Sequence, residues 1–298
     1  MTLRIEEIID RISTWQGKPV SFKPVYGGIT NQNFKVIVEN ESFFVSVSCD
    51  TSEFLGVNLS NKFHNNKICE KLNLSPKIIY FLAKEGVLIS EFLPIPPLSA
   101  KSMHNSDIQK RLIISLKKLH NGPSFLKKFD MFNLIKYYLK IAADKNIIFP
   151  AGYDDYLLMV ESIGNTLKPY RRDLVPCLND LIPENILYDG RKIYIIDFDY
   201  SGQNDLCFDL GNLFIESNFN DIQIREFLEN YFGYVSEKIV SRTYLHGILS
   251  DVGWSLWSFI QDRISNIDFD FKAYGLSRWQ RVLNKMDSGS VDKCLQYF

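Results

Sequence analysis

Paired cysteines are missing from this chain of 298 residues. Its cysteines are odd in number, no two of them form a CxxC pair, and the four histidines do not cluster with them in the sequence. This pattern argues against a disulfide framework and a structural zinc site, and we expect a protein of a reducing compartment, the cytoplasm. The cysteines are Cys49, Cys69, Cys177, Cys207 and Cys294.

An excess of charge of either sign is also missing. The 34 basic and 35 acidic residues leave a net charge of −1, so no overall field attracts nucleic acid or anionic lipid. No run approaches the roughly 18 apolar residues that a membrane-spanning helix needs. Residues 1–15 form an amphipathic pattern that contains acids, unlike the apolar core of a signal peptide. We therefore expect no nucleic-acid partner and no membrane span.

The first third of the chain is rich in predicted strands. Residues 3–16 predict a helix, and residues 21–48 alternate apolar and polar side chains as a hairpin does, with a break at Gly27-Gly28. Residues 57–73 predict a second helix, and residues 77–93 predict two more strands. The sequence therefore indicates a small β-rich lobe with one inserted helix.

The rest of the chain is mainly helical in pattern. The proline-bearing segment 93–99 is typical of a stiff connection. Helices are predicted over 105–120, 133–146, 153–169 and most of 205–298, and residues 185–198 predict a short hairpin turning at Asp189-Gly190. We expect an α+β protein with an N-terminal lobe over residues 1–93, a C-terminal lobe over residues 94–298 and one site in the cleft between them.

An acidic motif in residues 175–202 points to phosphoryl transfer. Asp180 and Asn185 are spaced D-x4-N, and after a predicted hairpin a strand ends in Asp197. Mg²⁺ prefers oxygen ligands and commonly takes only one or two protein side chains. Asn185 and Asp197 would hold the metal, and Asp180 would accept or orient the proton of an attacking hydroxyl. The alternative is that these acids and amides only form turns, as we expect of Asp189.

The same segment resembles the choline/ethanolamine kinase and aminoglycoside phosphotransferase family, relatives of the protein kinases. That family carries H-N-D-x-x-x-x-N and D-[FW]-E-Y-[AS]-G, and this chain has "LNDLIPEN" and "DFDYSG". The next segment, "NDLCFDLGNLF", is similar to the family's continuation, in which an aspartate, here Asp209, ties down the catalytic loop. "GGITNQNFKV" at 27–36 and "LKKLHN" at 116–121 extend the resemblance over nearly the whole chain.

The resemblance implies a two-lobed protein-kinase-like fold that binds ATP and Mg²⁺. The ATP phosphates would lie under the glycine loop, and the adenine would lie against the backbone of the segment between the lobes. The implied nucleotide-binding residues are Gly27, Gly28, Thr30 and Asn31 in the loop, and Glu91, Phe92 and Leu93 in the connecting segment.

An aromatic motif at 253–279 narrows the substrate class. Trp254 and Trp257 stand three apart, on one helical face, and Tyr274 follows on a later helix. Aromatic faces turned toward one point bind an ammonium by cation–π attraction, although two tryptophans at helical spacing also suit a core. The pattern W-x-x-W-x3-Q…D-F-x-x-Y is similar to the choline pocket of choline kinases. Asp199 would add a carboxylate facing the ammonium, or would instead hydrogen-bond within the turn before Ser201-Gly202.

Three positions depart from the family pattern. Leu178 replaces the catalytic-loop histidine, and Ser46 occupies the third-strand position where the family has arginine or lysine for the α- and β-phosphates. On the inserted helix, Ser60 and Lys62 stand where an acid is expected. One hypothesis is that Lys62 or Lys35 reaches the phosphates instead. The alternative is that both lysines are solvated surface charges.

Taken together, these features predict an ATP-dependent kinase that phosphorylates the hydroxyl of choline or ethanolamine, in phospholipid precursor metabolism. Two alternatives stay open. One is a catalytically silent module that binds a cationic metabolite, and the other is a kinase for another amino alcohol, such as thiamine or an amino sugar. The expected partner is a small amino alcohol, and a homodimer is left open.

Overall fold

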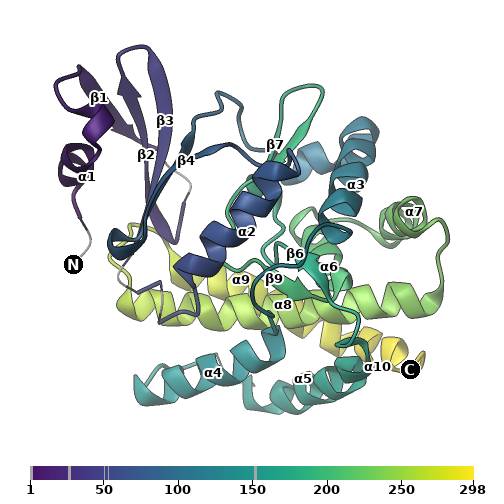
Figure 1. The fold of residues 1–298 in the computed structure, drawn as a ribbon. Helices are drawn as coiled ribbons and strands as arrows, with labels where there is room; N and C mark the ends of the chain where they lie inside the picture. Colours follow the sequence, from purple (N-terminus) through teal and green to yellow (C-terminus); the bar gives the residue numbers. More distant parts are fainter. Residues whose placement is uncertain (1–2, 26–27, 50, 53, 151–152) are drawn as a thin grey trace.

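The computed structural model describes residues 3–25, 28–49, 51–52, 54–150 and 153–298, and it has a β-rich and a helical part (Figure 1). The β-rich part holds a five-stranded antiparallel sheet in the order β1-β2-β3-β5-β4. Its elements are α1 (Ile5–Arg11), β1 (Val20–Pro24), β2 (Asn31–Val38), β3 (Glu41–Ser48), α2 (Leu59–Lys71), β4 (Ile78–Leu82) and β5 (Val87–Glu91). The predicted small lobe with one inserted helix is confirmed.

Two turns of this sheet use a left-handed backbone conformation. Between β2 and β3, Glu39 adopts a left-handed φ of 55°, and Gly86 adopts φ 68° before β5. The predicted break at Gly27-Gly28 falls between two separate strands, because β1 and β2 pair antiparallel, with Phe22 opposite Val36. Gly27 itself lies outside the described residues.

Alternation along β3 separates a core face from a polar face. Val45 and Val47 are fully buried in a cluster with α1 residues such as Ile8. Ser46, on the other face, lies opposite Asn33 of β2 and Leu88 of β5. The position expected to carry a phosphate-binding cation is therefore on β3, as predicted, and its serine is buried (6% exposed).

The connecting segment is bonded to the second part, as its prolines suggest. The N–H of Leu98 donates to the carbonyl of Ile186 at 2.8 Å, and Pro97 forms a bridge with Leu187. The elements that follow are α3 (Ser106–His120), α4 (Met131–Asp144), α5 (Tyr153–Leu167), β6 (Val175–Cys177), β7 (Ile186–Tyr188), β8 (Ile193–Ile195), β9 (Gly202–Asn204), α6 (Leu206–Glu216), α7 (Asp221–Phe232), α8 (Glu237–Ile264), α9 (Phe271–Asp287) and α10 (Ser290–Leu295). The α+β prediction is confirmed, whereas the exact lobe boundary at residues 93–94 stays a prediction.

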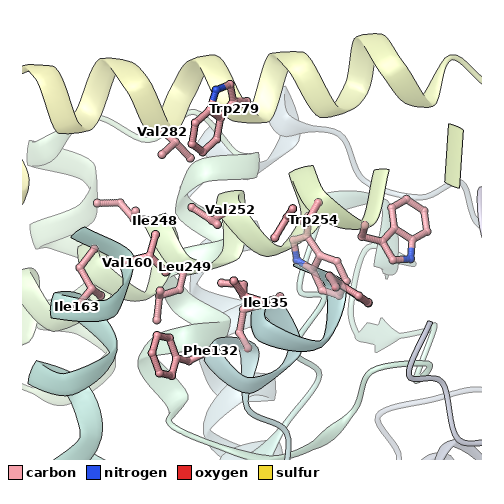
Figure 2. Packing of buried hydrophobic residues seen from close by; sticks show 14 of the residues in the cluster. Phe132, Ile135, Val160, Ile163, Ile248, Leu249, Val252, Trp254, Trp279 and Val282 are labelled. Carbon is pink, nitrogen blue, oxygen red and sulfur yellow. The ribbon is translucent and has the colours of Figure 1, made fainter. Parts of the chain in front are cut away.

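The long helix α8 forms the centre of the helical part. Its 28 residues are buried along much of their length between α4, α5, α6 and α9. Figure 2 shows Trp279 and Val282 of α9 pointing toward α8, with Phe132 and Ile135 of α4 on its other side. None of the helices in the described ranges is long and apolar enough to cross a membrane.

Candidate active site

The predicted base and metal ligands meet at one place. The side-chain amide of Asn185 donates to the carbonyl oxygen of Asp180 at 2.9 Å and lies 3.4 Å from its carboxylate Oδ2. The N–H of Ile196 donates to the carbonyl of Asn185 at 3.0 Å, so the strand that ends at Asp197 lies beside the loop. The hairpin β7–β8 thus brings together three residues that the D-x4-N…D spacing predicted.

The loop before Asp180 is held by a buried carboxylate. Asp209 of α6 is fully buried and accepts hydrogen bonds from the N–H groups of Leu178 (2.9 Å) and Asn179 (2.7 Å). Asn179 has a left-handed φ of 65°, and its side-chain amide donates to the carbonyl of Tyr200 at 2.9 Å. The loop is therefore fixed through its backbone, while the Leu178 side chain packs in a hydrophobic cluster.

The site concentrates negative charge. Burial and the nearby carboxylate of Asp197 raise the pKa of Asp180 to about 7. Burial and Asp199 also raise the pKa of Asp197, which has a left-handed φ of 61°, a costly conformation often found at functional sites. A cation bound between two such carboxylates favours the ionised form of both.

The donor atoms present fit a magnesium ion. Asn185 uses its amide N–H₂ group on Asp180, and no described residue donates to its amide oxygen Oδ1. The Oδ2 of Asp197 also accepts no hydrogen bond from the described residues, while its Oδ1 accepts the N–H of Asp199 at 3.2 Å. Oxygen donors with unused lone pairs in an acidic site are the ligands that Mg²⁺ prefers.

The predicted nucleotide loop reaches this acidic site through Asn31. Gly27 lies outside the described residues, Gly28 is exposed, and Thr30 is partly exposed at the loop's end. A side chain at position 28 would meet the amide of Asn33 at 2.4 Å, which explains a glycine there. The side-chain amide of Asn31 donates to Oδ2 of Asp199 at 2.9 Å, linking the glycine loop to the segment after Asp197.

The segment predicted to bind adenine keeps one backbone donor available. The N–H of Glu91 donates to the carbonyl of Lys77, and the N–H of Phe92 donates to that of Ser42. Among the described residues, none accepts a hydrogen bond from the N–H of Leu93. Lys35 lies 4.4 Å from the centre of the Phe92 ring, so it sits beside this segment.

The alternative that Lys62 is a solvated surface charge is wrong. It lies on α2, is 5% exposed, and forms an ion pair with Oδ1 of Asp199. Both oxygens of the Asp199 carboxylate thus have a partner, Lys62 on Oδ1 and Asn31 on Oδ2. These partners differ from the two that the sequence suggested, an ammonium of the substrate and a group within the turn. The substrate role of Asp199 stays a prediction.

The three predicted aromatic residues lie in one connected group of rings. Trp254 and Trp257 are in edge contact (6.4 Å between ring centres), and Trp257 contacts Phe271 at 5.7 Å. Phe269 contacts both Phe271 (4.9 Å) and Tyr274 (5.8 Å). Both tryptophans are nearly buried, at 4% and 3%, and their indole N–H groups have no hydrogen-bond partner among the described residues.

Two charged residues near Asp180 were not predicted. Arg278 of α9 is buried, pairs with Glu216 (3.2 Å) and Asp251 (3.3 Å), and donates to the hydroxyl of Tyr274. Its guanidinium lies 4.6 Å from the centre of the Tyr274 ring. Arg278 lowers and Glu216 raises the pKa of Asp180, so both lie within electrostatic reach of the base. No spacing in the sequence marks them, because their partners come from three different helices.

A second group of possible metal ligands is already satisfied. His120, Cys177 and Asp209 lie close together, and all three are buried. His120 uses one ring nitrogen on Tyr231 (2.7 Å) and the other on Asp209 (3.1 Å). Because Asp209 also accepts hydrogen bonds from the loop before Asp180, His120 and Asp209 act as a structural support for that loop.

Comparison with known proteins shows the family of this chain. A family model described as choline/ethanolamine kinase matches residues 22–282. Ethanolamine kinase 2 of Homo sapiens is 26% identical over 308 residues, covering 93% of this chain and 79% of that protein.

Solved structures show the same fold. A choline/ethanolamine kinase family protein from Mesorhizobium loti has a TM-score of 0.83 at 26% identity, covering 98% of this chain and 96% of that one. A structure of LicA in complex with AMP has a TM-score of 0.80 at 27% identity, covering 95% and 98%. A spectinomycin phosphotransferase shares the fold alone, with a TM-score of 0.61 at 15% identity over 94% and 95% of the two chains. The predicted two-lobed kinase-like fold is confirmed, and because the family model spans both its lobes, the chain belongs to the choline/ethanolamine kinase family.

Proposed function

We propose that the protein transfers the γ-phosphoryl group of ATP to the hydroxyl of choline or ethanolamine in a magnesium-dependent reaction. The observation that carries this proposal is the meeting of Asp180, Asn185 and Asp197 in a site where burial and the charge of Asp197 raise the pKa of Asp180 to about 7. Membership of the family and the AMP-bound LicA structure support a nucleotide in the same fold.

Asp180 is the base in this mechanism. A carboxylate whose pKa is raised toward neutrality is a better proton acceptor than an ordinary aspartate. The hydroxyl oxygen attacks the γ-phosphorus as its proton moves to Asp180, and ADP leaves as the bond to the β–γ bridging oxygen breaks. A metal held by Asn185 and Asp197 would neutralise negative charge on the phosphates.

The glycine loop and the connecting segment would bind the nucleotide. Gly28, Thr30 and Asn31 would lie over the phosphates, and the backbone of Phe92 and Leu93 would border the adenine. The free N–H of Leu93 supports this placement, since a purine nitrogen needs such a donor.

The aromatic group would bind the ammonium of the acceptor. A cation over the faces of Trp254, Trp257 and Tyr274 gains roughly 0.5–2 kcal/mol per ring, depending on desolvation. The ring contacts, which hold these side chains in one group, support this assignment.

A coupled assay of ADP release tests the proposal. The protein would be supplied with Mg²⁺ and ATP, and with choline, ethanolamine, thiamine or an amino sugar in parallel. Turnover with choline or ethanolamine that is lost in Asp180→Ala supports the proposal. Turnover only with thiamine or an amino sugar would keep the enzyme and change its acceptor. Choline binding in calorimetry without any turnover would indicate a silent binding module, a role consistent with Ser46 and Leu178.

A further inference from the structure

The buried face of α2 carries a lysine. Asn61, Lys62 and Asn65 lie on this face, and all three are buried. The side chains of Asn61 and Asn65 donate to the carbonyl of Ser201, at 2.7 and 3.2 Å. The helix is therefore fixed against the turn that follows Asp197, so Lys62 is held in place before any ligand arrives.

The contacts of Lys62 place its ammonium group between the glycine loop and the candidate metal ligands. Its Nζ pairs with Oδ1 of Asp199, and Asn31, at the end of the glycine loop, binds Oδ2 of the same carboxylate. Burial favours the neutral amine, but Asp199 and Asp197 outweigh it and raise the pKa of Lys62. A protonated lysine has three N–H donors, so the pair with Asp199 leaves donors for an anion.

Neither Ser46 nor Arg278 is suited to bind phosphate here. Ser46 of β3 has no charge, and its neighbours across the sheet are Asn33 and Leu88. Lys62 and Arg278 are the buried lysine and arginine of the described chain, and Arg278 is already paired with two carboxylates. The phosphates of a nucleotide under the glycine loop would therefore meet Lys62.

We propose that Lys62 on helix α2 binds the nucleotide phosphates in this chain, the role that Ser46 on β3 cannot fill, and that Asp199 is the positioning residue that holds Lys62 beside the glycine loop. This inference rests on the proposed function for the presence of a nucleotide, and it adds the residue that replaces the missing cation.

A structural role for Lys62 makes a different prediction. If Lys62 only neutralises Asp199, its removal leaves a buried unpaired carboxylate and destabilises the whole protein. The experiment therefore removes that carboxylate first. Asp199→Asn, whose amide oxygen still accepts a hydrogen bond from Lys62 and so keeps the lysine in position, is compared with the double variant Asp199→Asn/Lys62→Met. Thermal unfolding verifies that both are folded. The dissociation constants of ATP and adenosine are measured by calorimetry without magnesium.

The proposal predicts that adding Lys62→Met weakens ATP roughly 10- to 150-fold, the cost of a hydrogen bond to a charged group, and leaves adenosine binding unchanged. Lys67→Met, which removes another α2 lysine paired with a carboxylate (Glu70, 2.7 Å), leaves both constants unchanged. Equal ATP affinity in the two Asp199 variants would overturn the proposal, as would an equal loss for ATP and adenosine.

The unaltered chain separates this inference from the proposed function. If it binds ATP and turns over an amino alcohol while the two Asp199 variants bind ATP equally, only the role of Lys62 is lost. If it binds neither ATP nor adenosine, the proposed function and the role of Lys62 are both overturned.

Discussion

His120 of α3 contacts Asp209 of α6, with 3.1 Å between Nε2 and Oδ2, and both side chains are buried. The other ring nitrogen, Nδ1, lies 2.7 Å from the hydroxyl of Tyr231, so both nitrogens of His120 have a partner. Asp209 in turn accepts the backbone N–H groups of Leu178 and Asn179. A histidine thus supports the catalytic loop from another helix, which explains how the loop is held with leucine at position 178.

Restoring histidine at position 178 should therefore not improve the enzyme. Leu178 is fully buried in a hydrophobic cluster, so Leu178→His should lower the free energy of unfolding by roughly 1–3 kcal/mol and leave turnover unchanged or lower. Chemical denaturation and ADP release measure the two effects. Leu178→Met, which keeps an apolar side chain of similar volume, should cost less than about 1.5 kcal/mol. A tenfold gain in turnover with unchanged stability in the histidine variant would contradict this account.

Replacement of Asp180, the proposed base, should stabilise the protein when no metal is bound. The pKa of Asp180 rises from an unfolded value of about 3.9 to about 7, so the folded state pays a penalty that grows as the pH rises through this window. Asp180→Asn should unfold several degrees higher than the unaltered chain at pH 8, with little difference at pH 4. Its turnover should fall by at least about 10²-fold. Asp189→Asn, at an exposed turn, is the control. Equal melting temperatures of Asp180→Asn and the unaltered chain at pH 8 would show that ionised Asp180 does not destabilise the fold.

A smaller aromatic side chain at position 257 should raise the KM for the acceptor more than the KM for ATP. Trp257→Phe keeps an aromatic core side chain but offers a smaller face to an ammonium, so the KM for choline should rise about 2- to 30-fold while the KM for ATP stays constant. Trp279→Phe is the matched control, because Trp279 belongs to the same cluster but stacks on Tyr153 at 4.0 Å. If Trp257→Phe raises both KM values equally, Trp257 is a core residue only.

Asp205 should contribute stability that disappears in acid. It is buried, and although burial opposes its ionisation, His246 and Arg242 hold its pKa below the usual range. A depressed pKa gives stability that is present above about pH 4 and is lost as the pH falls toward the folded-state pKa. Asp205→Asn should cost about 1.5–3 kcal/mol at pH 7 and clearly less at pH 3.

Denaturant unfolding of the Asp205 variant at the two pH values provides the measurement. Asp107→Asn removes an exposed carboxylate 3.9 Å from Lys110 and should cost less than about 1 kcal/mol at either pH. A cost for Asp205→Asn that is the same at pH 3 and pH 7 would show that the lost stability is not electrostatic.

The sequence by itself determined the local features of this protein. Strand alternation and the D-x4-N spacing of Asp180 and Asn185 depend on residues near one another in the chain, so periodicity and spacing predict them. The same holds for the pair Trp254 and Trp257, which one helix places together.

Only the tertiary structure decided which charges meet. Lys62 pairs with Asp199, and Arg278 with Glu216, across segments that no local pattern connects. Whether a lysine is a solvated charge or a buried cation depends on the carboxylates that other elements bring to it, since burial costs are met only by such partners. The pKa of Asp180 likewise depends on neighbours from three other segments, which is why the sequence predicted its role and the fold determined its protonation.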